Sequence, residues 1–256
     1  MRRKSPIIKA HKTSLYILFQ CALGGPLSPL LSNIMLNELD KELEARVLCF
    51  VRYADDMLIF TKSAKASERV MKSVSRFIVE KLGLKVNMEK SRTCKPNEIK
   101  FLGFGYYFDY KAEMWKPKPH AESVKKFQRK LRKLTKRNWS ISLDMRIKKL
   151  NYLIKGRVNY FRIGMMKGVL TTIDQKLRFR IRMIIWKQWK VPKKQIASLV
   201  KLGIPLEEAK GLTWCRKGYN FIGHSKVVHR ALSNKRLEQR GIPSALNYYL
   251  AVHTVI

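Results

Sequence analysis

Acidic residues are scarce in this sequence. Its 256 residues include 18 Asp and Glu against 54 Lys and Arg, which gives a formal net charge of +36 at pH 7 and an isoelectric point near 10.4. This imbalance excludes the mixed-sign surface of an ordinary metabolic enzyme. Hydrophobic residues still make up 46% of the chain, too many for a disordered basic tail, so we expect a folded body. Such a charge favours nucleic acid as the partner, because each neutralised phosphate releases counterions, with an anionic membrane surface as the weaker alternative.

Cysteine and long apolar runs are scarce too. The four cysteines, Cys21, Cys49, Cys94 and Cys215, stand far apart and form no C-x-x-C pair, which indicates neither a zinc knuckle nor a disulfide framework. We therefore expect a reducing, cytoplasmic setting. Apolar runs stay short of the roughly 20 residues that a membrane-spanning helix needs, so we expect no membrane span. We expect neither a membrane partner nor a small-molecule cofactor.

Charge and pattern both change near residue 112. Residues 1–110 carry 19 basic and 11 acidic residues, whereas residues 111–256 carry 35 and 7. In the first part, apolar residues at helical spacing behind Ser28-Pro29 predict a helix over 30–43. A second amphipathic helix is predicted over 67–82, ending at Gly83, a usual C-terminal stop.

Strand patterns separate these two helices. Residues 47–53 and 57–61 are short apolar runs on either side of Ala54-Asp55-Asp56, which predicts two strands joined by a tight turn. Further strands are predicted at 84–86, 101–108 and 114–115. The first part is therefore expected to be α+β.

The second part is helical and basic. Apolar stripes predict helices over 124–134, 143–161 and 169–189, whose polar faces are almost purely positive. A solvated helix face usually mixes both signs, so we interpret these faces as a surface that follows RNA phosphates, with a plain solvated face as the alternative. The residues that we expect to bind RNA are Lys125, Lys126, Arg129, Lys130, Arg132, Lys133, Arg157, Tyr160, Arg178, Arg180, Arg182 and Lys187.

Two adjacent carboxylates, Asp55 and Asp56, are expected at the tip of the hairpin. Like charges this close repel each other unless a cation neutralises them. A divalent metal is such a cation: in two-metal phosphoryl transfer the ions lie about 3.5–4 Å apart and are fixed by carboxylates. A plain hairpin turn, in which Asp is common, explains the pair equally well from these residues alone.

Four stretches in fixed order resemble consecutive motifs of group II intron reverse transcriptases. They are residues 24–34 (GGPLSPLLSNI), 53–56 (YADD), 83–91 (GLKVNMEKS) and 101–104 (FLGF). Residues 156–161 (GRVNYF) and 186–189 (WKQW) are similar to that family's thumb and maturase (X) domain. The resemblance covers about residues 24–256.

The resemblance implies an α+β fold in which part of a right-hand polymerase palm is followed by an all-α thumb/maturase domain. The palm would occupy residues 23–112, the thumb and maturase domain 113–215, and a basic C-terminal segment 216–256. Residues 1–22 match nothing in the family pattern and are expected to form a separate extension.

The resemblance also implies roles for single residues. Asp55 would be the catalytic metal ligand, Asp56 its weaker partner, and Tyr53 a support for the primer end. Lys90 would lie near the incoming triphosphate, where a cation offsets phosphate charge. Gly24-Gly25 would let the backbone approach the nascent base pair. From the residues alone, Lys90 reads equally as a surface lysine and the glycine pair as a plain turn.

The sequence departs from the family at its front. The first acidic residue of the chain is Glu38, so no upstream Asp is available as the third palm carboxylate. We therefore expect an incomplete two-metal Mg²⁺ site, with a separate polypeptide supplying the fingers and the first palm Asp.

The function that the resemblance implies is RNA-directed DNA polymerase, a nucleotidyltransferase, and maturase of a group II intron. Its partners would be intron RNA and an RNA/DNA template-primer in a cytoplasmic ribonucleoprotein. The alternatives are an RNA-binding splicing factor of the maturase type without polymerase activity, and an inactive remnant of a mobile element.

Overall fold

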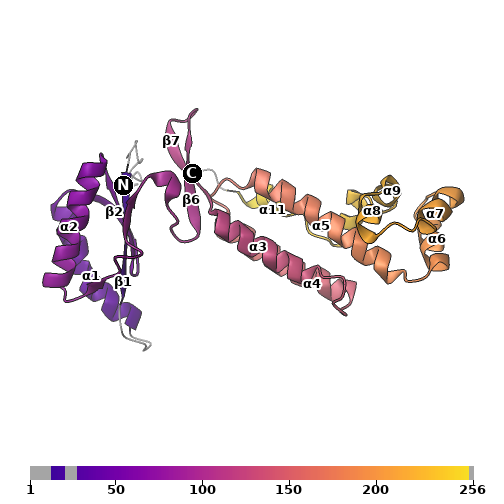
Figure 1. Ribbon diagram of the computed structural model, residues 1–256, viewed down its shortest axis with the longest axis horizontal. Coiled ribbons are helices and arrows are strands. Elements are labelled where there is room, and N and C mark those ends of the chain that lie inside the picture. Colours follow the sequence, from indigo (N-terminus) through magenta and orange to yellow (C-terminus); the bar gives the residue numbers. More distant parts are fainter. Residues whose placement is uncertain (1–12, 21–27, 254–256) are drawn as a thin grey trace. The chain divides into compact units, whose positions relative to one another are not determined.

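The computed structural model describes residues 13–20 and 28–253 and divides the chain into two compact units, residues 1–120 and 121–256 (Figure 1). Gly24-Gly25 lies outside the described residues. The boundary falls after His120 and not near residue 112, where the charge changes. The reason is that β7 (Met114–Pro119) continues through the basic Lys-Pro-Lys-Pro stretch and pairs with β6 (Phe104–Asp109) in an antiparallel hairpin.

A five-stranded antiparallel sheet forms the centre of the first unit. Its strands are β1 (Thr13–Gln20), β2 (Cys49–Tyr53), β3 (Asp56–Thr61), β4 (Lys85–Val86) and β5 (Arg92–Cys94). β1 pairs with β3 on one side and with β4 and β5 on the other. The expectation that residues 1–22 form a separate extension is therefore wrong for residues 13–20. That stretch is rich in aromatic and branched aliphatic residues, which suit a strand.

Helices α1 (Ser28–Ala45) and α2 (Ala64–Glu80) cover one face of this sheet (Figure 1), which confirms both predicted helices. α2 begins earlier than predicted because the Ser63 hydroxyl caps it by accepting from Ala66 N, and it ends just before Gly83, whose φ of 62° suits glycine. The core under the helices is fully buried and apolar. It consists of Leu36, Leu39, Leu43, Met57, Ile59, Val74 and Ile78.

The opposite face of β3 packs against the segment that follows β5. Leu58 contacts Cys94, Ile99 and Phe101 there, next to the short 3-10 helix η1 (Pro96–Glu98). Successive residues of β3 thus serve two cores, as the two-residue period of a strand requires. The continuous apolar run over 57–60 reflects this burial on both faces.

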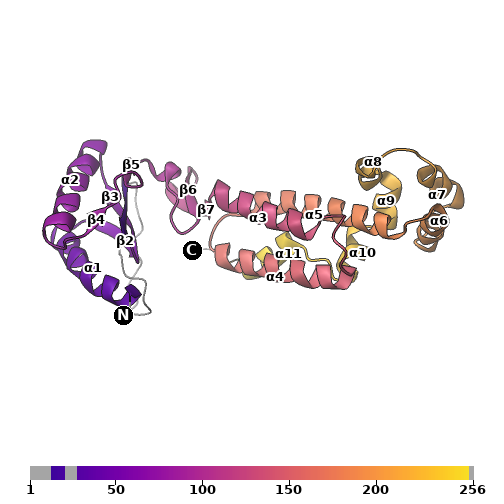
Figure 2. The same ribbon diagram turned by 60° about the horizontal axis from the view of Figure 1, so that its bottom comes forward.

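The second unit is helical throughout its described residues. Its helices are α3 (Ala121–Leu134), α4 (Leu143–Phe161), α5 (Lys167–Gln188), α6 (Pro192–Lys201), α7 (Leu206–Thr213), α8 (Tyr219–His224), α9 (Lys226–Ala231), α10 (Asn234–Gln239) and α11 (Ala245–Val252). The three long helices predicted from the sequence are confirmed, and α3 and α5 lie side by side (Figure 2). Within the described part of the chain, no helix combines the length and apolar character needed to cross a bilayer.

The C-terminal residues belong to this unit and do not form a segment of their own. α11 packs against α4 and α5, and α8 packs against α5. The buried carboxylate of Asp174 in α5 accepts hydrogen bonds from Ser244 Oγ (2.8 Å), Ala245 N (2.8 Å) and Leu246 N (3.0 Å). A carboxylate at a helix start both satisfies free N–H groups and complements the positive end of the helix dipole, so Asp174 anchors α11.

Arginine side chains make the corresponding contacts at helix ends. Arg146 of α4 is 1% exposed and donates to the carbonyl oxygens of Leu134, the last residue of α3, and of Lys136 and Trp139, which follow it. Arg182 of α5 is 5% exposed and donates to Leu232 O (3.0 Å). Burial lowers the pKa of both guanidinium groups, because desolvation disfavours the charged form.

We expect Asp174→Asn to lower the free energy of unfolding by about 2–3 kcal/mol, because the amide keeps a single acceptor oxygen and loses the charge that favours the start of α11. Urea unfolding followed by circular dichroism measures this change. Asp144→Asn is the matched control, since Asp144 forms an exposed ion pair with Arg240, and it should cost less than about 1 kcal/mol. Equal effects of the two substitutions would contradict the anchoring role of Asp174.

Candidate functional site

The YADD stretch forms the predicted hairpin. β2 and β3 pair antiparallel with Tyr53 opposite Asp56, which leaves Ala54 and Asp55 as a two-residue turn. Ala54 has a φ of 52°, the left-handed conformation that tight hairpins use. Asp55 and Asp56 are half-buried and Tyr53 is 62% exposed. The hairpin therefore presents both carboxylates and the tyrosine at one end of the sheet.

Arg52 ties this tip to α1, a role that sequence reasoning missed. Its Nε donates to Asp40 Oδ1 at 2.8 Å, and its Nη1 donates to Asn33 Oδ1 at 2.8 Å and to Ala54 O at 3.2 Å. The Arg52–Asp40 pair is largely shielded from solvent, with side chains 13% and 22% exposed. An arginine inside an otherwise apolar strand was the signal that could have revealed it.

Asp56 and Lys90 line one cavity of about 410 Å³ in the first unit. Lys90 follows β4, whereas Asp56 begins β3, so the fold brings together two residues that are 34 positions apart in the chain. Glu89, Arg92 and Lys100 line the same cavity and were not singled out from the sequence. The cavity thus combines carboxylates with three cations.

This combination suits a phosphate-bearing substrate held beside a metal ion. The cations offset the charge of phosphate groups, and carboxylate oxygens are the ligands that Mg²⁺ prefers. Asp56 lines the cavity, whereas Asp55, the residue before it in the turn, is not among the lining residues. Mg²⁺ in proteins takes one or two such carboxylates alongside substrate phosphates and water. In the described part of the chain, no cluster of three or more His, Cys, Asp or Glu is placed to hold a metal.

In the second unit, α3 presents a free basic face. Six of its predicted RNA-binding residues are exposed, and none forms an ion pair among the described residues. These residues are Lys125, Lys126, Arg129, Lys130, Arg132 and Lys133. On α4, Arg157 is half-buried and Tyr160 is 53% exposed.

The basic residues of α5 differ from the expectation, because most of them bond inward. Arg182 is buried, so the prediction that it is displayed is wrong. Arg178 pairs with Glu238 at 3.0 Å, and Arg180 donates to Thr135 Oγ1 at 2.6 Å. Lys187 stays exposed but donates to Asn138 Oδ1 at 3.1 Å. Helical periodicity locates these residues on α5 but cannot identify their acceptors, which come from α10 and from the segment after α3.

Exposed aromatic residues with cations over their rings lie beyond the predicted surface. The Arg137 guanidinium lies 4.3 Å from the ring centre of Tyr219, and Lys217 Nζ lies 4.3 Å from that of Phe221. Aromatic and basic residues interleave over residues 214–221 (WCRKGYNF), a pattern typical of single-stranded nucleic-acid binding. This alternation of aromatic and basic residues was the sequence signal that could have identified Tyr219 and Phe221.

Comparison with known families gives two matches. The family described as "Reverse transcriptase (RNA-dependent DNA polymerase)" matches residues 5–106, and the "Group II intron, maturase-specific domain" matches residues 124–202. The first match contains the hairpin and the cavity, and the second contains α3, α4 and α5. The reverse transcriptase match begins at residue 5, inside the segment that we expected to match nothing.

Three curated proteins show similarity over part of their length. Protein YkfC of Escherichia coli (strain K12) is 31% identical over 31% of this chain and 30% of its own length. The retron Mx65 reverse transcriptase of Myxococcus xanthus is 37% identical over 28% of this chain and 18% of its own. Protein P of duck hepatitis B virus (strain United States/DHBV-16) is 30% identical over 35% and 11%. The chain therefore spans less than a third of each of these relatives.

Reverse transcriptases as a family use divalent metal ions and act on nucleic acids, which agrees with the carboxylates, the cations and the basic helices described above. With the reverse transcriptase match in the first unit and the maturase match in the second, the chain belongs to the group II intron reverse transcriptase/maturase family.

Proposed function

We propose that this chain takes part in RNA-directed DNA synthesis with Mg²⁺ at the cavity of Asp56 and Lys90, as the palm and thumb of a right-hand polymerase. The observation that carries the proposal is the shared cavity, where Asp56 of the YADD hairpin lines the same space as Lys90, Arg92 and Lys100. When bound, Mg²⁺ would activate the primer 3′ oxygen and stabilise the leaving pyrophosphate. Lys90 and its neighbours would hold the triphosphate through its negative charge.

The proposal includes a second polypeptide. Glu89 lines the cavity of Asp56 and Asp40 is paired with Arg52, but no group of three or more His, Cys, Asp or Glu among the described residues is placed to hold a metal. In this proposal that polypeptide supplies the fingers and a further carboxylate.

We also propose that the second unit binds group II intron RNA and supports its splicing in a cytoplasmic ribonucleoprotein. What supports this is the exposed basic face of α3, which has no acidic partner among the described residues and lies within the maturase-specific match. RNA binding without polymerase activity remains the alternative function, and the two are separated by the tests below.

Asp55→Asn should weaken the Mg²⁺-dependent affinity for a deoxynucleoside triphosphate by about tenfold or more, because one charged metal-binding oxygen is lost. Fluorescence titration with a labelled deoxythymidine triphosphate, with Mg²⁺ or with chelator, measures this, and primer extension should fall in parallel. RNA affinity should stay unchanged. Asp109→Asn, which breaks an ion pair with Lys116 on the β6–β7 hairpin, is the control.

Two outcomes would overturn the polymerase proposal. The first is an Asp55→Asn variant whose nucleotide binding depends on Mg²⁺ as strongly as that of the unchanged chain. A chain that binds RNA tightly but shows no Mg²⁺-dependent nucleotide binding would favour the splicing-factor alternative instead.

Arg52→Lys should weaken the same Mg²⁺-dependent binding several-fold while leaving RNA affinity intact. Lysine keeps the charge but lacks the planar fork that reaches Asp40, Asn33 and Ala54 O together, so the hairpin tip loses its fixed position. Arg76→Lys on α2 is the matched control, because Arg76 makes only an exposed contact with Glu80. If both variants behave alike, Arg52 does not position the site.

RNA affinity should fall steeply with salt, with log K decreasing by about 0.7 per contacted phosphate for each unit of log salt on a single strand. Arg129→Gln on α3 should lower this slope by about one phosphate contact. Arg69→Gln, an exposed arginine of α2, should leave the slope unchanged. Filter binding over a salt series provides both slopes, and a flat salt response would exclude phosphate-driven binding.

A further inference from the structure

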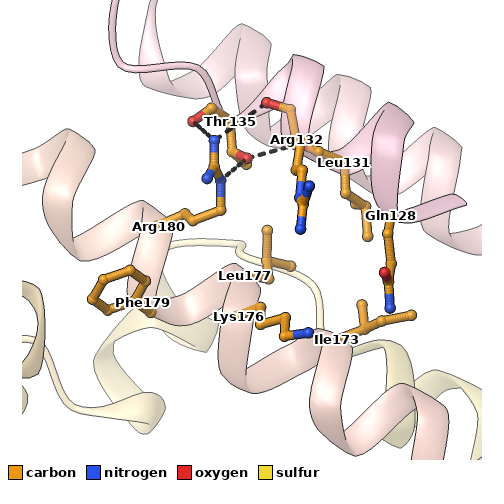
Figure 3. Close-up of a pocket in the computed structure, with 9 residues that line it drawn as sticks. All are labelled: Gln128, Leu131, Arg132, Thr135, Ile173, Lys176, Leu177, Phe179 and Arg180. Atoms are coloured by element: carbon orange, nitrogen blue, oxygen red, sulfur yellow. Dashed lines mark hydrogen bonds between the residues drawn. The ribbon is translucent and has the colours of Figure 1, made fainter. Parts of the chain in front are cut away.

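A cavity of about 200 Å³ lies between α3 and α5 (Figure 3). Its floor is apolar and buried: Leu131 of α3 is 7% exposed, and Ile173 and Leu177 of α5 are 2% and 3% exposed. The half-buried ring of Phe179 lines it as well. An open slot with an apolar floor suits a flat, weakly polar group.

The mouth of the slot is cationic. Arg132 of α3 and Lys176 of α5 line it and are exposed, and neither side chain forms an ion pair within the described residues. No acidic residue is among those that line the slot. Gln128 extends from α3 toward Ile173 (Figure 3), which places an amide donor and acceptor at the entrance.

Hydrogen bonds among residues that line the slot join its two walls. Arg180 of α5 donates to Thr135 Oγ1 at 2.6 Å and to Thr135 O at 3.1 Å, and the Thr135 hydroxyl donates to Leu131 O at 2.7 Å (Figure 3). These bonds lock α5 against the end of α3. A slot that is already formed costs less ordering on binding than one that must open.

The ring of Phe179 is fixed from the other side. It stacks on His224 of α8 with ring centres 4.2 Å apart. Gly223 allows this approach, because a Cβ atom there would lie 2.5 Å from Cε2 of Phe179. The C-terminal helices thus support one wall of the slot.

We infer that the slot between α3 and α5 is a subsite for one unstacked nucleotide of an RNA strand. The base would lie on Leu131, Ile173 and Leu177, while Arg132 and Lys176 bind the flanking phosphates. RNA proteins read single-stranded or bulged nucleotides by placing splayed bases on apolar or aromatic surfaces and by hydrogen bonding to base edges. A nucleotide fits this slot because it is flat and weakly polar at one end and anionic at the other, and the exposed basic face of α3 continues beside the slot. This inference rests on the RNA binding proposed above.

Crosslinking tests the inference directly. A short oligouridylate containing 4-thiouridine is irradiated with the full chain, and the crosslinked peptides are identified by mass spectrometry. We expect crosslinks within residues 173–179 and 128–131. Gln128→Phe places a ring over the mouth without altering the buried floor, and should remove these crosslinks and weaken oligouridylate binding about tenfold. Circular dichroism and thermal unfolding establish that the variant folds.

Lys176→Gln gives a second measurement that leaves the core untouched, because Lys176 is exposed. It should weaken oligouridylate binding more than Lys148→Gln, which removes the same charge from an exposed position on α4. Uridine monophosphate is added as a competitor at the same concentration as the oligouridylate. If it removes the crosslinks, the slot binds a free nucleotide and the inference is overturned.

The outcomes separate the two proposals. If the chain binds no RNA, the RNA-binding function fails and the slot subsite fails with it. If the chain binds RNA but crosslinks elsewhere, or if Gln128→Phe folds and leaves the crosslinks in place, the subsite alone is wrong and RNA binding stands.

Discussion

The helical unit depends on bonds from arginine side chains to main-chain carbonyl oxygens. Arg146 binds three carbonyls at and after the end of α3, Arg180 binds Thr135 O, and Arg182 binds Leu232 O. Arg236 binds Leu202 O and Ala231 O at 2.6 and 2.8 Å. The last carbonyls of a helix lack partners within it and carry its negative partial charge, so a guanidinium group satisfies both needs. In a unit with few acidic side chains, these oxygens are the acceptors available to buried cations.

This use of arginine changes what a basic composition means. The sequence offers the cations of α3 and those of α5 as one phosphate-binding surface, but the structure divides them. The α3 cations are exposed, whereas Arg180 and Arg182 donate hydrogen bonds to other groups of the protein. Net charge predicts a nucleic-acid partner because it is summed over all residues, but it cannot identify which cations face the partner.

The elements that sequence predicted well are those set by near neighbours. The YADD hairpin and the helices α1 to α5 follow from periodicity, turn residues and capping within a few positions. β1 was missed because its pairing with β3 joins residues 38 to 48 positions apart, from Leu18 with Asp56 to Thr13 with Thr61. The shared cavity of Asp56 and Lys90 was implied by family resemblance alone, whereas Arg92, Lys100 and Arg52 acquire their roles only when β5 and α1 come together.

The carbonyl acceptors of Arg146 have an evolutionary consequence. A salt bridge between two side chains is lost when either residue mutates, so both positions must be retained together. A guanidinium group that binds backbone oxygen depends on a single codon, because every amino acid at the accepting position supplies the same oxygen. Residues 134 and 136 can therefore vary without losing these bonds as long as the backbone path is kept, while position 146 is constrained. Position 139 differs, because the Trp139 ring also lies 5.3 Å from the Arg146 guanidinium.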